Sequence, residues 1–273
     1  MFHTKINQPW TGFTNQIFAL ITGIIDAYKK GDKVVVVDNF LNDIHNTTYT
    51  PISNIFNIQK INTFLKNNYD IIIIDKNNIQ FNGPYNAFKL GWIDTFNDNM
   101  FEKILSNIIY NDDFILKSEL ILKDINSEKK INVIHLRLEN DGISHWSKMN
   151  NLSHNNYKIF LENKYINIIK NYVSKTDENI ILSSSLSNRV IDFLKNNNYS
   201  YKFTHKFFDD REKNAIVDLL VSKCCNNIFI GNFNIKNNNG STFSYYIWKI
   251  INNVTKIYID LDKIREYAVI IKE

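Results

Sequence analysis

The sequence has little of the residues on which several protein classes depend. It contains two cysteines, Cys224 and Cys225, with three prolines and eight glycines in 273 residues. Two adjacent cysteines make neither a disulfide framework nor a zinc site, both of which need spaced ligands. No apolar run approaches the roughly 20 residues of a membrane span, and the first residues do not resemble a signal peptide. We therefore expect a soluble, cytoplasmic, metal-independent protein with no membrane span.

Arginine is also scarce, and its scarcity is informative. Lysine outnumbers arginine 28 to 4, while there are 43 asparagines, 44 isoleucines and five alanines. This bias is typical of an AT-rich genome, such as that of a low-GC organism or a large virus. Most asparagines then represent drift at the surface, whereas an arginine that persisted marks a constrained position. The four arginines are Arg137, Arg189, Arg211 and Arg265.

Charge and apolar content exclude two further classes. The net charge is only +4, from 32 basic and 28 acidic residues, and the lysines are scattered. A nucleic-acid-binding protein usually concentrates its basic residues on one element, so we expect no nucleic-acid partner. Apolar residues make up 44% of the chain, which is far above the disordered range. At this length the chain forms one large or two medium domains.

Short apolar runs alternate with longer segments at helical spacing. The runs are continuous rather than alternating, as in parallel strands covered by helices on both faces. Strands are expected at 34–37, 71–74, 132–136, 179–182, 227–230 and 256–259, and helices at 15–29, 157–173, 211–224 and 242–252. This order predicts an α/β fold with two Rossmann-like domains. A polar stretch at 126–130 places the domain boundary between 1–128 and 129–273.

Three segments could carry chemistry. Gly12 precedes the first expected helix, where backbone can approach a ligand, although Asn15 could simply cap that helix. His135, Arg137 and Glu139 share one face at the carboxyl end of a strand, where open α/β sheets bind ligands. An arginine there can hold phosphate oxygens bidentately, and the alternative is a buried ion pair between Arg137 and Glu139.

The third segment runs from Asp218 to Ser244. It contains a helix, a strand ending in Gly231, and Gly240 followed by Ser241 at the start of another helix. A glycine and hydroxyl residues at a helix N-terminus can bind an anion, although Ser241 could be only an N-cap. The sequence contains neither a Walker loop nor a Gly-x-Gly-x-x-Gly fingerprint. A pyrophosphate held by Arg137 and a helix terminus is the most economical interpretation.

These same segments resemble the superfamily of GDP-fucose-dependent fucosyltransferases, which includes α-1,2 and α-1,6 enzymes and protein O-fucosyltransferases. Residues 12–18, GFTNQIF, look like the N-terminal Gly-x-x-Asn-Gln-x-Phe loop. Residues 135–141 look like the His-x-Arg motif in its O-fucosyltransferase form. Residues 218–220, 229–232 and 241–244 are similar to the C-terminal donor-site motif. Leu138 departs from the α-1,2 and α-1,6 enzymes, which have a second arginine there.

The resemblance implies a GT-B-like fold, with two Rossmann-like domains facing a central cleft. Residues 1–128 would form the acceptor side, and 129–273 the donor side. It also implies inversion at the fucose carbon, no metal, and no cofactor besides GDP-fucose as donor substrate. Arg137 would hold the β-phosphate and stabilise the departing GDP, and Glu139 or Asp141 would be the base. The implied donor-binding residues are Gly12, Asn15, Gln16, His135, Asp218, Ser241, Thr242, Phe243 and Ser244.

The leading hypothesis is an inverting, metal-independent fucosyltransferase. It would move fucose from GDP-fucose to a hydroxyl of a glycan or protein acceptor. One alternative is a GT-B transferase that uses another nucleotide sugar. A second is a catalytically silent nucleotide- or glycan-binding protein. Arg137 is the residue that discriminates between these hypotheses.

Overall fold

The chain folds into two compact units, seen in a computed structural model. The first unit comprises Met1–Lys117 and Lys206–Val217, and the second comprises Ser118–His205 and Asp218–Glu273. Two helices, α4 (Asp112–Lys123) and α8 (Arg211–Ser222), contain limits between the units. The structure describes residues 2–6, 12–38, 40–41, 50–76, 86–88, 98–126, 128–183, 185–204, 206–234, 239–265 and 269–272.

The first unit is built on a parallel sheet with the strand order β3-β2-β1-β4. The strands are β1 (Phe2–Ile6), β2 (Val34–Asp38), β3 (Ile72–Asp75) and β4 (Asn86–Phe88). The helices are α1 (Phe13–Lys29), α2 (Ile58–Tyr69) and α3 (Asn99–Ser106), with a short 3-10 turn at Ile52–Asn54. A strand order that runs outward from β1 in both directions is the doubly wound arrangement.

The second unit has a larger sheet, with the order β12-β11-β8-β5-β6-β7. Its strands are β5 (Ile131–His135), β6 (Glu178–Leu182), β7 (Ser200–Phe203), β8 (Ile228–Gly231), β11 (Thr255–Tyr258) and β12 (Val269–Lys272). Every pairing is parallel except that of β11 with β12. All residues of β5, β6 and β8 are buried, which explains their continuous apolar sequence.

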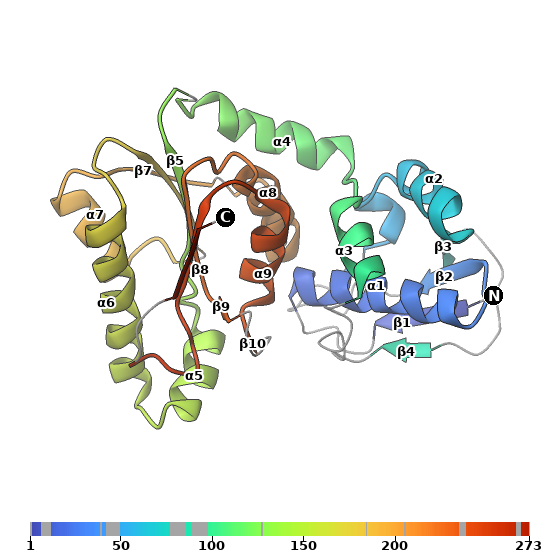
Figure 1. The fold of residues 1–273 in the computed structure, drawn as a ribbon, viewed down its shortest axis with the longest axis horizontal. Helices are drawn as coiled ribbons and strands as arrows, with labels where there is room; N and C mark the ends of the chain where they lie inside the picture. Colours follow the sequence, from blue (N-terminus) through green and yellow to red (C-terminus); the bar gives the residue numbers. More distant parts are fainter. Residues whose placement is uncertain are drawn as a thin grey trace. The chain divides into compact units, whose positions relative to one another are not determined.

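Helices cover this sheet and carry the side chains that seal it. They are α5 (Asn140–Met149), α6 (His154–Tyr172), α7 (Arg189–Asn196) and α9 (Thr242–Ile250). Figure 1 shows α6 and α9 on opposite sides of this sheet. Tyr157, Leu161 and Tyr165 recur every four residues on α6, so they share one face of that helix and join the core around Ile134. A two-stranded antiparallel ladder, β9 (Phe233–Asn234) with β10 (Asn239–Gly240), lies between β8 and α9 in the chain.

The predicted α/β fold class is confirmed: the first unit combines a parallel sheet with helices, and the second combines helices with a sheet that is parallel except for β12. The four predicted helices correspond to α1, α6, α8 and α9, and all six predicted strands are present. The periodicity did not reveal α5, which begins at Asn140, or α2, α3, α4 and α7. Its strand pattern also omitted β1, β4, β7, β9, β10 and β12. The domain boundary expected after residue 128 stays a prediction; the compact units themselves divide the chain after Lys117 and again on either side of Lys206–Val217.

Not every asparagine is surface drift. Asn132 and Asn179 are fully buried at the start of β5 and β6, where Asn132 Nδ2 donates to Asn179 Oδ1 at 3.0 Å. Asn132 Nδ2 also donates to Asp177 Oδ2, and Asn227 Nδ2 donates to Asn132 Oδ1. These amides satisfy one another between strands, so the polar groups can be buried without a large penalty. Among the described helices, none is long and apolar enough to cross a bilayer.

Candidate functional site

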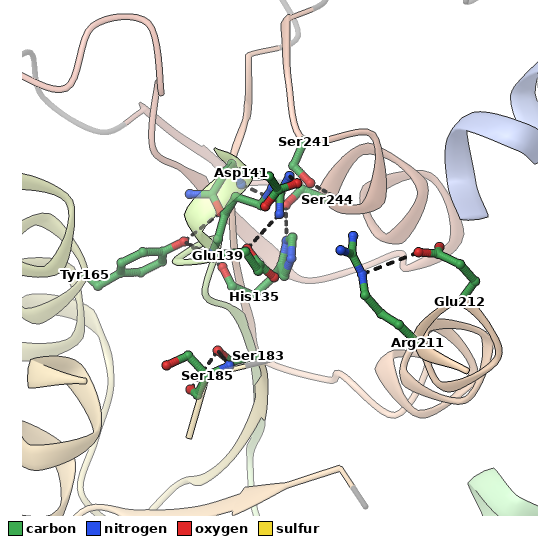
Figure 2. Close-up of polar contacts among 12 residues, drawn as sticks. His135, Glu139, Asp141, Tyr165, Ser183, Ser185, Arg211, Glu212, Ser241 and Ser244 are labelled. Atoms are coloured by element: carbon green, nitrogen blue, oxygen red, sulfur yellow. Dashed lines mark hydrogen bonds and ion pairs between the residues drawn. The ribbon is translucent and has the colours of Figure 1, made fainter. Parts of the chain in front are cut away.

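A charged cluster occupies the carboxyl end of β5, between the neighbouring strands β8 and β6. Arg137 Nη1 donates to Glu139 Oε2 at 2.7 Å, and its Nη2 donates to Asp141 Oδ2 at 3.1 Å. Figure 2 shows Glu139 and Asp141 at this strand end, close to His135. The side chains of Arg137 and Glu139 are 21% and 18% exposed, whereas that of Asp141 is 55% exposed. The Arg137–Glu139 ion pair foreseen as the alternative is therefore present, and it includes Asp141 as a second carboxylate.

Mutual attraction keeps the inner pair of this cluster ionised. Burial alone would lower the pKa of Arg137, but the charges of Glu139 and Asp141 and their hydrogen bonds raise it overall. Burial opposes ionisation of Glu139, yet Arg137 holds the pKa of that carboxyl below its ordinary value. Glu139 also has non-helical dihedral angles and is the N-cap position of α5, so the chain turns into the helix directly after it.

His135 ends β5 and connects the cluster to α9. Its Nδ1 lies 2.7 Å from Ser244 Oγ, and its ring meets the ring of Phe243 edge-on at 5.1 Å. Burial lowers the pKa of His135 to about 4, so the imidazole is neutral at pH 7. Ser241 caps α9 by accepting a hydrogen bond from Ser244 N, as expected for an N-cap. The structure thus brings His135, Phe243 and Ser244 together, with Ser241 one helical turn away.

A buried tyrosine supports the backbone of the same strand end. The hydroxyl of Tyr165 donates a hydrogen bond to the His135 carbonyl oxygen at 2.7 Å. The same hydroxyl accepts a hydrogen bond from the backbone N–H of Arg137 at 3.0 Å. It also lies 2.6 Å from Asn232 Oδ1, and Asn232 N donates to Ser244 Oγ at 2.9 Å. Both Tyr165 and Asn232 are fully buried. This network fixes the backbone on both sides of Leu136.

Two glycines make room for the approach of α9 to β8. A Cβ on Gly231 would lie 2.7 Å from the Phe229 ring and 3.0 Å from Ser244 Oγ. Gly240 has a φ of 121°, and a Cβ there would lie 2.3 Å from the Asn232 carbonyl oxygen. That carbonyl also accepts a hydrogen bond from Ser241 N. Both positions therefore require glycine for the close approach, and Gly240 for its backbone conformation as well.

Asp218 lies in a different setting from Arg137. It is a half-buried residue of α8, and Thr204, directly after the edge strand β7, donates a hydrogen bond to it. Burial raises the pKa of Asp218 to about 6, and the hydrogen bond from Thr204 only partly offsets this. Strand β6 separates β7 from β5 in the sheet, so the strand end that carries Thr204, the partner of Asp218, is not the one that carries Arg137. The nucleoside contact expected for Asp218 remains a prediction.

Gly12, Asn15 and Gln16 belong to the first unit. Helix α1 begins at Phe13 with Gly12 as its N-cap residue, so Asn15 is inside the first turn and does not cap the helix. The orphan N–H of Phe13 instead donates to the carboxylate of Glu212, a buried residue of α8 that belongs to the same unit. Gln16 is fully buried. Donor binding by Gly12, Asn15 and Gln16 remains a prediction.

Sequence reasoning missed three residues that shape this site. Tyr165 was visible only as one member of the apolar face of α6, and Asn232 only as part of a motif. Gly142, within α5, packs against the Arg137 guanidinium. A glycine inside a helix is a signal, because glycine disfavours helices, but α5 itself was not predicted. Across the described ranges, no group of three or more His, Cys, Asp or Glu is arranged to hold a metal ion.

Comparisons of sequence find no relative of this chain. No family model matches it, and no curated protein matches it significantly.

Comparison of structures gives a different result. The chain is similar to an α-1,6-fucosyltransferase, NodZ, soaked with GDP-fucose, with a TM-score of 0.66 and 13% identity, covering 100% of this chain and 99% of that one. A structure of fucosyltransferase NodZ from Bradyrhizobium gives a TM-score of 0.64 and 13% identity, with 99% and 98% covered. POFUT1 in complex with GDP-fucose gives 0.58 and 12%, with 91% and 93% covered. The chain therefore has the GT-B-like fold that these fucosyltransferase structures share.

Proposed function

We propose that this protein is an inverting, metal-independent fucosyltransferase that takes GDP-fucose as donor and a glycan or protein hydroxyl as acceptor. The main support is the position of Arg137 at the carboxyl end of β5, beside the strand that leads to the N-terminus of α9. The pairing of Ile134 with Ile230 makes β5 and β8 direct neighbours. A guanidinium and a helix N-terminus at adjacent strand ends suit a diphosphate.

In the proposed reaction the acceptor oxygen attacks the anomeric carbon of fucose from the face opposite GDP. The bond between this carbon and the β-phosphate oxygen breaks, and GDP leaves with the bonding electrons. Arg137 would hold the β-phosphate and stabilise its developing negative charge. Ser241, Thr242, Phe243 and Ser244 would line the diphosphate site. The neutral His135 would keep its position through Ser244 rather than exchange protons near pH 7.

A carboxylate would take the proton of the acceptor hydroxyl. Asp141 is the better candidate, because its side chain is 55% exposed and can be reached by an incoming hydroxyl. Glu139 is 18% exposed, and its lowered pKa makes it a weaker base. We assign Glu139 the role of holding Arg137 in place. Phosphate oxygens would replace Asp141 at Nη2 of Arg137 and so free its carboxylate.

The proposal is tested by incubating the protein with GDP-fucose and a panel of glycan and peptide acceptors in the presence of a chelator. We expect fucosylated product and GDP, with product of the opposite anomeric configuration seen in its proton NMR coupling. Retention of configuration, or a need for a divalent ion, would contradict the mechanism.

Binding separates the proposal from its alternatives. Calorimetric titration with GDP, UDP and ADP should give selective binding of GDP. Preference for UDP would indicate a transferase with another donor. Binding of GDP-fucose without turnover on any acceptor in the panel would instead support a silent binding protein.

A further inference from the structure

We propose that Gly142 is a positioning residue for Arg137: the absence of a side chain at this position allows the guanidinium to pack directly against the first turn of α5. This inference rests on the proposed function for its catalytic meaning. The packing itself can be tested without any ligand.

The backbone of Gly142 does not require glycine. It is the third residue of α5 and is buried. Its φ is not among the positive values found at Gly31 and Gly240. Glycine disfavours a helix relative to alanine, so a reason for this glycine has to come from its surroundings.

The surroundings consist of Arg137. A Cβ on Gly142 would lie 3.2 Å from Cζ, 3.3 Å from Nε and 3.4 Å from Nη2 of Arg137. All three atoms belong to the guanidinium, and they are the three nearest neighbours that such a Cβ would meet. Any side chain at this position would therefore push the guanidinium by a few tenths of an ångström or more.

The guanidinium has little freedom to accept that push. Its Nη1 is bound to Glu139 at 2.7 Å and its Nη2 to Asp141 at 3.1 Å. The backbone N–H of Arg137 is bound to the hydroxyl of Tyr165. A side chain at position 142 would displace a guanidinium whose two terminal nitrogens are both hydrogen-bonded, so the ion pairs with Glu139 and Asp141 would lengthen or break.

The contact with Gly142 also places the positive charge of Arg137 beside the N-terminus of a helix. Arg137 lies against the N-terminal turn of α5, where unpaired N–H groups make the environment positive. A cation is unfavourable there unless anions accompany it, and Glu139 and Asp141 supply them. An incoming diphosphate would be attracted by both the guanidinium and the helix terminus. Close packing on Gly142 is what keeps these two positive groups together.

The test compares Gly142→Ala with Ser144→Gly, which changes an exposed position two residues further along the same helix. Gly142→Ala should stay folded, with a melting temperature within a few degrees of wild type, because the gain in helix propensity and the weakened ion pairs act in opposite directions. It should bind GDP about tenfold more weakly, the effect of one displaced charged hydrogen bond. Ser144→Gly should lower the melting temperature by a few degrees and leave the GDP affinity unchanged.

A readout without nucleotide separates this inference from the proposed function. The pKa of Glu139, followed by carbon NMR of its carboxylate, is held down by Arg137, so it should rise toward its ordinary value in Gly142→Ala and stay low in Ser144→Gly. An unchanged pKa in Gly142→Ala would overturn the inference, as would loss of the folded state in that variant. Failure of the wild-type protein to bind GDP, with the pKa rising as expected, would instead refute the proposed function alone.

Discussion

The Oγ of Ser244 lies 2.7 Å from Nδ1 of His135, so the first turn of α9 is tied to the last residue of β5. The same hydroxyl accepts a hydrogen bond from the backbone N–H of Asn232. One serine therefore joins three segments of the second unit. Because Gly231 has no side chain, Ser244 can approach the end of β8 this closely.

Removal of this hydroxyl should destabilise the protein. Ser244→Ala leaves the His135 ring nitrogen and the Asn232 N–H buried without their partner, and a buried unsatisfied group costs about 1–3 kcal/mol. We expect a loss of that order in the free energy of unfolding, measured by urea denaturation. Ser144→Ala, an exposed serine of α5, is the control and should change stability little. A Ser244→Ala protein as stable as wild type would contradict the role given to this contact.

The hydroxyl of Tyr165 should matter for Arg137, not only for stability. Tyr165→Phe removes the acceptor of Arg137 N and the donor to the His135 carbonyl, both buried. Tyr157→Phe is a matched control on the same helix, since it removes a hydroxyl that donates a hydrogen bond to the Leu261 carbonyl oxygen at 3.1 Å. Both variants should lose about 1–3 kcal/mol of stability, but only Tyr165→Phe should also weaken GDP binding. Equal GDP affinity in the two variants would show that Tyr165 has a purely structural role.

Stability should depend on pH through His135. Burial lowers the pKa of His135 to about 4 from the ordinary 6.5, so the unfolded chain binds more protons than the folded one between these values. The contribution is fully present above pH 6.5 and is lost as pH falls toward 4, by about 3 kcal/mol in total. Urea denaturation at several pH values should show this slope, and His135→Asn should flatten it. The same slope in His135→Asn would assign it to other groups.

Asp218 should make stability depend on pH in the opposite direction to His135, over an overlapping pH range. Its pKa is raised to about 6 by burial, so the folded state binds the additional proton and stability falls as pH rises from about 4 to 6. Asp218→Asn should therefore stabilise the unliganded protein at pH 7.5. If Asp218 also contacts the guanine base, the same variant should bind GDP less tightly. Thr204→Val removes the hydrogen bond that lowers this pKa, so it should raise the pKa of Asp218 further, as carbon NMR can measure.

Apolar periodicity was sufficient to predict the elements whose burial is uniform. The strand at 132–136 and the helix at 157–173 correspond closely to β5 and α6, because one is buried on both faces and the other has one apolar face. Helix α5 was not predicted because its sequence is mostly polar and only four of its residues are buried. Glu139 has the extended conformation that was assumed for it, and the helix starts at the next residue, Asn140.

Two residues of the candidate site could be predicted because each leaves a local signal in the sequence. Arg137 stood out because arginine is rare in this chain, and Ser241 because it precedes an apolar helical pattern. The roles of Tyr165 and Asn232 depend on contacts across 28 and 67 positions of the chain, and no local pattern reports such contacts. Buried Asn132 and Asn179 show that composition alone does not separate drift from structural need.

The central claim is that Arg137 holds the diphosphate of a GDP-sugar, and its most direct test is calorimetric titration of GDP into Arg137→Lys beside the wild-type protein. Lysine keeps the positive charge but cannot donate two parallel hydrogen bonds. We expect the wild-type protein to bind GDP selectively and Arg137→Lys to lose about 1.5–3 kcal/mol of binding free energy, with an unchanged melting temperature confirming its fold. Equal GDP affinity in the two proteins would contradict the account.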